Sequence, residues 1–166
     1  MSHRQTIARL YDETGHLVLR RCTQLLRDPQ EAMDATQWVF LRALETELEV
    51  RSPGETLSWL YQTAVHRCLW TMRNRRRRGH LRVVHREELV GQPAPSAEGQ
   101  AIDRDLIEQT IAQVDDRTAE IALLTWGMGL SNDRAAQMLD VSVRTIGRAR
   151  VRFEQQLRAT AGEEAS

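Results

Sequence analysis

Apolar residues recur at helical spacing along nearly the whole chain, and no stretch shows the alternation of a half-buried strand. One helix is predicted over 7–26, a second opens at Asp28-Pro29, and a third covers 57–79. Asp28 suits the N-cap and Pro29 the first helical position, and Glu31 completes a capping box. The pattern therefore predicts an all-α fold.

Residues 86–103 interrupt this pattern, because they hold prolines, glycines and acids without any period. Such a composition is typical of a flexible linker. Beyond it, apolar spacing predicts further helices near 107–114, 119–126 and 133–139, and one from 143 onward. A chain of 166 residues is long enough for two small domains. We therefore expect helical domains at 1–85 and 104–161, the second containing a helix-turn-helix.

The charges are balanced overall, with 23 basic and 23 acidic residues, but they are not mixed along the chain. Residues 66–86 hold 8 arginines and no acid, and residues 144–158 hold 5 arginines and 1 acid. Two unmixed basic blocks in an otherwise acidic chain are not expected of an ordinary solvated surface. Their distribution is the first indication of a nucleic-acid partner.

The last two predicted helices have the spacing of a helix-turn-helix motif. Ser131 can cap the first of them, residues 140–141 turn the chain, and Ser142 can cap the second. In that second helix, Val143, Ile146, Phe153 and Leu157 form an apolar stripe, and the opposite side carries Arg144, Arg148 and Arg152, with Thr145 beside them. Such arginines can read guanine edges or neutralise phosphates. Arg150 falls within the apolar stripe, where it either extends past its neighbours or pairs with an acid such as Asp116 or Glu120.

The second and third helices each place unusual side chains opposite their apolar face. On the second, Asp34, Trp38 and Leu41 resemble a docking surface for a basic helical partner, or else pack within the protein. On the third, the side chains opposite the apolar face are Trp59, Thr63, His66, Trp70, Arg73 and Arg77. Aromatic rings that stack on unpaired bases, interleaved with arginines, are typical of proteins that hold single strands.

Readings based on catalysis or metal binding find little support in the sequence. A zinc site built from His66, Cys68, His80 and His85 would not have a usual ligand spacing. No glycine-rich phosphate loop, nucleophile elbow or acid-base pair stands out. We expect no enzyme activity, no cofactor and no metal. The sequence shows no secretory signal and no apolar run of membrane-spanning length, so we expect a cytoplasmic protein without membrane insertion.

Three segments resemble the extracytoplasmic-function (ECF) family of RNA polymerase sigma factors. Residues 31–42, with Gln-x-Val-Phe-Leu, are similar to that family's core-binding helix. Trp59-Leu60-Tyr61 and the arginine-rich helix that follows resemble its region for promoter melting and −10 recognition. The third segment resembles its −35-reading helix-turn-helix through Gly129-Leu130-Ser131, Ala135-Ala136, Leu139 and Ser142-Val143-x-Thr145-Ile146.

The resemblance implies a role for each group of residues. Docking on the β′ clamp helices of core RNA polymerase would use Asp34, Gln37, Trp38 and Leu41. Melting and −10 recognition would use Trp59, His66, Trp70, Arg73 and Arg77. Recognition of the −35 element of promoter DNA would use Arg144, Thr145, Arg148 and Arg152, with the second domain resting on the β flap. Members of the family are often masked by an anti-sigma factor.

The chain also departs from the family pattern. His66 stands where Asn is usual and Trp70 where Asp is usual, and Arg150 replaces a Leu. Two alternatives to an ECF-type sigma factor therefore remain open. One is a helix-turn-helix regulator that binds duplex DNA without polymerase, although no dimerisation helix is visible. The other is a sigma-like decoy that occupies polymerase without melting DNA.

Overall fold

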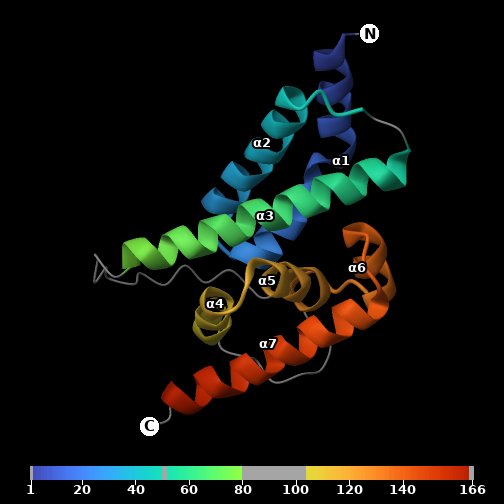
Figure 1. The fold of residues 1–166 in the computed structure, drawn as a ribbon. Coiled ribbons are helices and arrows are strands. Elements are labelled where there is room, and N and C mark those ends of the chain that lie inside the picture. The colour runs from blue at the N-terminus through green and yellow to red at the C-terminus, as the bar shows by residue number, and fades with distance from the viewer. Residues whose placement is uncertain (1, 50–51, 80–103, 165–166) are drawn as a thin grey trace.

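The protein is described here by a computed structural model, which covers residues 2–49, 52–79 and 104–164. Within these ranges every regular element is helical (Figure 1). In chain order the elements are α1 (His3–Leu26), α2 (Pro29–Glu45), α3 (Pro53–Gly79), α4 (Arg104–Gln113), α5 (Asp116–Ala122), the π-helical turn η1 (Leu123–Gly127), α6 (Asn132–Leu139) and α7 (Val143–Glu164). The predicted all-α fold is confirmed, while the predicted linker, 86–103, lies outside the described residues. Across the described ranges, no helix combines the length and apolar character needed to cross a membrane.

Helices α1, α2 and α3 form the N-terminal helical part, and one face of each helix supplies its core. The most deeply buried side chains there include Val18, Cys22, Leu26, Val39, Leu60, Val65 and Cys68. Asp28 caps α2 as predicted, because its carboxylate accepts a 2.8 Å hydrogen bond from the Glu31 N–H, and Pro29 follows in the first turn. The Glu31 side chain contacts Arg75 of α3, so it ties two helices together, a role that the predicted capping box did not include.

Helices α4 to α7 form the C-terminal helical part, in which α7 packs across α4, α5 and α6 (Figure 1). Three side-chain caps start the shorter helices and α7, each by accepting a backbone N–H: Asp115 for α5, Ser131 for α6 and Ser142 for α7. Asp140 has the left-handed φ of 52° that reverses the chain between α6 and α7. The predicted helix-turn-helix is confirmed.

The C-terminal part differs from the sequence expectations in two details. The helix expected over 119–126 starts earlier, because Asp115 caps it, and it ends in the π-helical turn η1. In the expected apolar stripe of α7, Ile146 and Phe153 are buried, but Val143 is 45% exposed because it lies in the first turn, beyond the packed part of the helix.

Arg150 contacts neither of the two acids that were considered as its partners. Its guanidinium lies 4.7 Å from the centre of the Trp126 ring, and its Nη1 donates to Asn132 Oδ1 at 2.7 Å. The side chain therefore covers an exposed tryptophan and ties α7 to the start of α6. Of the two alternatives left open for Arg150, pairing with an acid such as Asp116 or Glu120 is not the one found, because those acids contact His66, Arg73 and Arg117.

The two helical parts pack against each other along α3, which runs between them (Figure 1). Helix α3 contacts α4, α5 and α6, and α1 contacts η1. The fit at η1 is close: a Cβ added at Gly127 would lie 2.6 Å from a Leu25 methyl of α1. Near the same point, Arg21 of α1 donates to the Met128 carbonyl at 3.0 Å.

Candidate nucleic-acid interface

The residues of α3 that were expected to hold a single strand fall into three groups. His66 and Arg73 face α5 of the C-terminal part. Trp70 is 51% exposed and Arg77 is exposed near the end of the helix. Trp59 is partly buried and lines a shallow groove between α3 and α6. Part of the predicted face therefore contacts other helices of the protein itself.

Trp70 belongs to a three-part stack that links two of the predicted surfaces. The Arg67 guanidinium lies 4.2 Å from the centre of the Trp70 ring and 5.0 Å from the centre of the Trp38 ring. Cation–π attraction at these distances stabilises the Trp38 ring and the Trp70 ring in the positions they occupy around Arg67. Trp38 comes from α2 and Trp70 from α3, so Arg67 joins the expected docking surface to the expected strand-holding face. The sequence reasoning missed Arg67, although its three-residue spacing from Trp70 places them on neighbouring positions of one helix.

The docking surface predicted on α2 is largely open. Leu41 is 57% exposed, and Asp34 and Gln37 are exposed beside it. Trp38 is partly buried because its ring packs against the core and under Arg67. An exposed leucine next to a half-covered tryptophan, bordered by a carboxylate, is the kind of surface that anchors a protein partner.

His66 forms an ion pair whose acidic partner is almost fully buried. Its Nε2 lies 2.6 Å from Glu120 Oε1, and Arg117 Nη1 donates to the other carboxylate oxygen at 2.9 Å. The hydrogen bond to Glu120 raises the pKa of His66, although burial opposes the shift. Burial acts to raise the pKa of Glu120, but the bonds from His66 and Arg117 outweigh it and the pKa is lowered.

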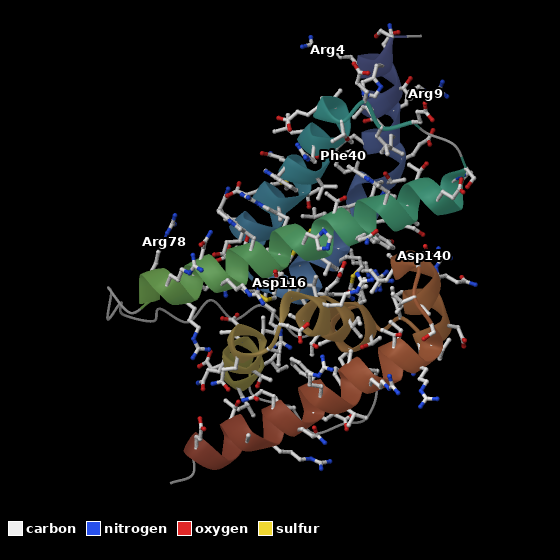
Figure 2. The ribbon with its side chains drawn as sticks, in the orientation of Figure 1. Arg4, Arg9, Phe40, Arg78, Asp116 and Asp140 are labelled. Carbon is white, nitrogen blue, oxygen red and sulfur yellow. The ribbon has the colours of Figure 1, made fainter. Side chains whose placement is uncertain are left out.

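Arg73 makes a second contact with the start of α5. It pairs with the exposed carboxylate of Asp116, and its Nη2 donates to the Val114 carbonyl at 3.5 Å. Figure 2 shows Asp116 at the start of α5, against α3, while Arg78 points away at the far end of α3. Arg75, which lies between Arg73 and Arg78 on α3, pairs with Glu31 and with Glu108 of α4. The basic run of α3 therefore divides into inward-facing and outward-facing arginines.

The expected reading face of α7 is exposed. Arg144, Thr145 and Arg148 lie on its first two turns, where they follow the cap formed by Ser142. The Thr145 hydroxyl also shares a 2.9 Å hydrogen bond with the Ser142 hydroxyl. Arg152, one turn further, bends toward α5 and lies 3.4 Å from an Asp115 carboxylate oxygen. Three of the four predicted residues thus face outward, and the fourth extends toward α5.

The residues considered for zinc do not converge where they can be placed. Cys68 is fully buried in the core, and the His66 ring bonds to Glu120. His80 and His85 lie outside the described residues. Among the described residues, no cluster of three or more histidines, cysteines or carboxylates is positioned to hold a metal ion.

Comparison with known proteins gives matches in sequence and in fold. Residues 10–78 match the family described as Sigma-70 region 2, which spans most of α1, all of α2 and nearly all of α3. No curated individual sequence matches the chain. The sigma factor RpoE of Bartonella quintana, solved in complex with the anti-sigma factor NepR, shares the fold with a TM-score of 0.53 at 18% identity. The match covers 95% of this chain and 98% of that one. The resemblance to ECF-type sigma factors is therefore confirmed, by a family match over residues 10–78 and by a fold shared along nearly the whole chain.

Proposed function

We propose that this sigma factor divides its contacts between its two helical parts. Residues 1–85 bind core RNA polymerase and hold the melted −10 strand, residues 86–103 link the parts, and residues 104–161 read the −35 element. The observation that carries this division is the match to Sigma-70 region 2 over residues 10–78. This segment contains both the docking surface of α2 and the strand-holding face of α3. The proposed role is binding and strand opening, without covalent chemistry by this chain.

Polymerase docking is assigned to the surface of α2 that carries Asp34, Gln37, Trp38 and Leu41. Its chemistry suits a helical partner with basic residues, and we assign this partner as the β′ clamp helices of core polymerase. The exposed Leu41 supports the assignment, because water alone does not favour a leucine that is 57% exposed on a charged helix.

Strand holding is assigned to Trp59, His66, Trp70, Arg73 and Arg77 of α3. Trp70 offers a half-exposed ring on which an unpaired base can stack, and Arg67 supports that ring from one side. Arg77 is exposed and able to contact phosphates. A tryptophan at position 70 also suggests that stacking contributes more to −10 recognition here than in family members with Asp.

Recognition of the −35 element is assigned to Arg144, Thr145, Arg148 and Arg152 of α7, with the C-terminal part resting on the β flap. A recognition helix enters the major groove by its N-terminal residues. The first two turns of α7 are exposed and carry forked cations, which supports this assignment. The RpoE neighbour was solved with an anti-sigma factor, so we also propose an anti-sigma factor as a partner of this chain.

Transcription with core polymerase tests the proposal directly. The purified protein and core RNA polymerase would transcribe fragments of genomic DNA from the organism that the protein comes from. The 5′ ends of the transcripts would then be sequenced. We expect discrete new starts that share upstream −10 and −35 elements. Leu41→Ser should abolish polymerase binding and starts, whereas Val151→Ser, which alters an equally exposed residue of α7, should retain both.

Other outcomes would favour the alternatives. Stable polymerase binding without any starts would indicate a sigma-like decoy. Duplex binding without polymerase binding would indicate an independent helix-turn-helix regulator.

A further inference from the structure

Two cysteine side chains meet in the core of the N-terminal helical part. Cys22 belongs to α1 and Cys68 to α3, and both are 0% exposed. Their thiols are hydrogen-bonded to each other, although the two residues lie far apart in the chain. The whole chain contains 2 cysteines, so both of its thiols lie at this one contact.

We propose that Cys22 and Cys68 form a reversible redox clip, in which a peroxide oxidises the two thiols to a disulfide that joins α1 to α3. Both cysteines lie within the segment that matches Sigma-70 region 2. Neither of them belongs to the residues assigned above to polymerase or DNA. The inference therefore does not depend on those assignments.

The packing around the two thiols brings α1 and α3 into direct contact. Val18, one turn before Cys22, and Ala64, one turn before Cys68, are also fully buried, and the small Ala64 side chain leaves little between the helices. A disulfide needs Cα atoms about 4.4–6.8 Å apart, so it forms only between elements that pack closely. Starting from a hydrogen bond between the thiols, we expect rotation of the two side chains to bring the sulfurs to the bonded distance of about 2.05 Å.

The contact also makes the two thiols chemically unequal. Because the Cys68 thiol donates to the Cys22 sulfur, the pKa of Cys22 is lowered, although burial opposes this shift. The same hydrogen bond and burial together raise the pKa of Cys68. A peroxide oxidises the thiolate form of a cysteine. We therefore assign Cys22 as the sulfur that is oxidised first and Cys68 as the thiol that completes the disulfide.

One molecule of hydrogen peroxide is consumed for each disulfide. The Cys22 thiolate attacks one peroxide oxygen, the O–O bond breaks, and hydroxide leaves while Cys22 becomes a sulfenic acid. The Cys68 sulfur then attacks the Cys22 sulfur, the S–O bond breaks, and the hydroxyl group leaves with the Cys68 proton as water. Two thiols thus lose two electrons and two protons, and the peroxide is reduced to two waters. A small dithiol reverses the reaction by thiol–disulfide exchange.

Burial determines how the clip responds to an oxidant. A reagent reaches thiols that have no exposed surface only when the core opens locally, and a small peroxide needs a smaller opening than a bulky reagent. Once it has formed, the disulfide restricts the unfolded chain and so stabilises the folded N-terminal part. Oxidation should therefore hold α1 and α3 together and raise the temperature at which this part unfolds.

The test treats the folded full chain with hydrogen peroxide, denatures it, alkylates the remaining thiols and maps the peptides by mass spectrometry. We expect no alkylated cysteine, and a peptide joining Cys22 to Cys68 that is lighter by two hydrogens than the two reduced peptides together. Dithiothreitol should restore both thiols. Non-reducing electrophoresis should show a monomer, and circular dichroism should show a higher melting midpoint for the oxidised chain than for the reduced one.

Cys22→Ala and Cys68→Ala are the matched controls. Each variant keeps one thiol, so neither can form the internal disulfide, and peroxide should not raise the melting midpoint of either. The peptide map of the unaltered chain decides the question even if a variant does not fold. Two free thiols after peroxide treatment, sulfinic acid in place of the disulfide, or a disulfide without a higher midpoint would overturn the proposal. These measurements require neither DNA nor polymerase, so a failure of the proposed sigma function would appear separately, in the transcription assay.

Discussion

Replacing Arg148 by alanine should weaken recognition of the −35 element while leaving the fold intact. Arg148 is exposed in the second turn of α7, and alanine is the best helix former, so folding should change by less than about 0.5 kcal/mol. An arginine that reads a guanine edge contributes about 1–3 kcal/mol of discrimination. At 25 °C this corresponds to a loss of about 5- to 150-fold in binding to the intact element.

The assay is promoter binding by the reconstituted holoenzyme, on a duplex with the mapped −35 element and on one with that element scrambled. The ratio of the two affinities isolates base reading from general attraction. The control is Arg158→Ala, which removes the same charge from the same helix about 15 Å further along its axis. We expect Arg148→Ala to reduce the ratio and Arg158→Ala to preserve it.

Salt dependence distinguishes the two roles that an arginine can have here. A residue that only neutralises a phosphate would weaken both duplexes equally, and its removal would reduce the slope of log affinity against log salt by about 0.9. An unchanged affinity ratio for Arg148→Ala would mean that Arg148 does not read the −35 element. The assignment of the reading face of α7 would then be wrong for its central residue.

Three further predictions concern α3 and the interface between the parts. Trp70→Ala should weaken open-complex formation by about 1–3 kcal/mol, measured by permanganate reactivity of the melted strand. The control Trp126→Ala should leave open-complex formation unchanged, and equal losses for the two variants would contradict the stacking role of Trp70. The pKa of His66 is raised by its bond to a carboxylate, so its contribution to the packing of α5 against α3 is complete below the ordinary histidine value and lost above the raised one. The radius of gyration, measured by small-angle X-ray scattering, should therefore increase as the pH rises from below the ordinary histidine pKa to above the raised one, and His66→Gln should flatten this profile. Gly127→Ala should also expand the chain, because its Cβ meets a leucine methyl of α1, whereas Gly147→Ala, which has open space around it, should not; identical radii would refute the close approach.

The local features of the fold were predictable because their signals lie within a few residues. Asp28, Ser131 and Ser142 each cap the helix that the sequence indicated, since a short polar side chain before an apolar run reaches only the nearest N–H groups. Asp140 reverses the chain between α6 and α7 for an equally local reason.

The long-range partners were not predictable by the same reasoning. Periodicity shows which side of a helix is polar, but not whether that side meets water or another helix. His66 and Arg73 therefore looked like free DNA contacts, and their pairing with α5 depends on residues 43 or more positions away. The partner of Arg150 was equally unpredictable, because Asn132 carries no charge that would suggest a pair.

The stack of Trp38, Arg67 and Trp70 has a consequence for how such a chain can evolve. A substitution at any of the three weakens the support of the two side chains that remain, so it alters the surface proposed for polymerase and the surface proposed for the melted strand together. Effects of paired substitutions in contact should not be additive. If both surfaces act as proposed, promoter preference and affinity for the transcription machinery are inherited as one trait, and divergence in one requires compensation in the other.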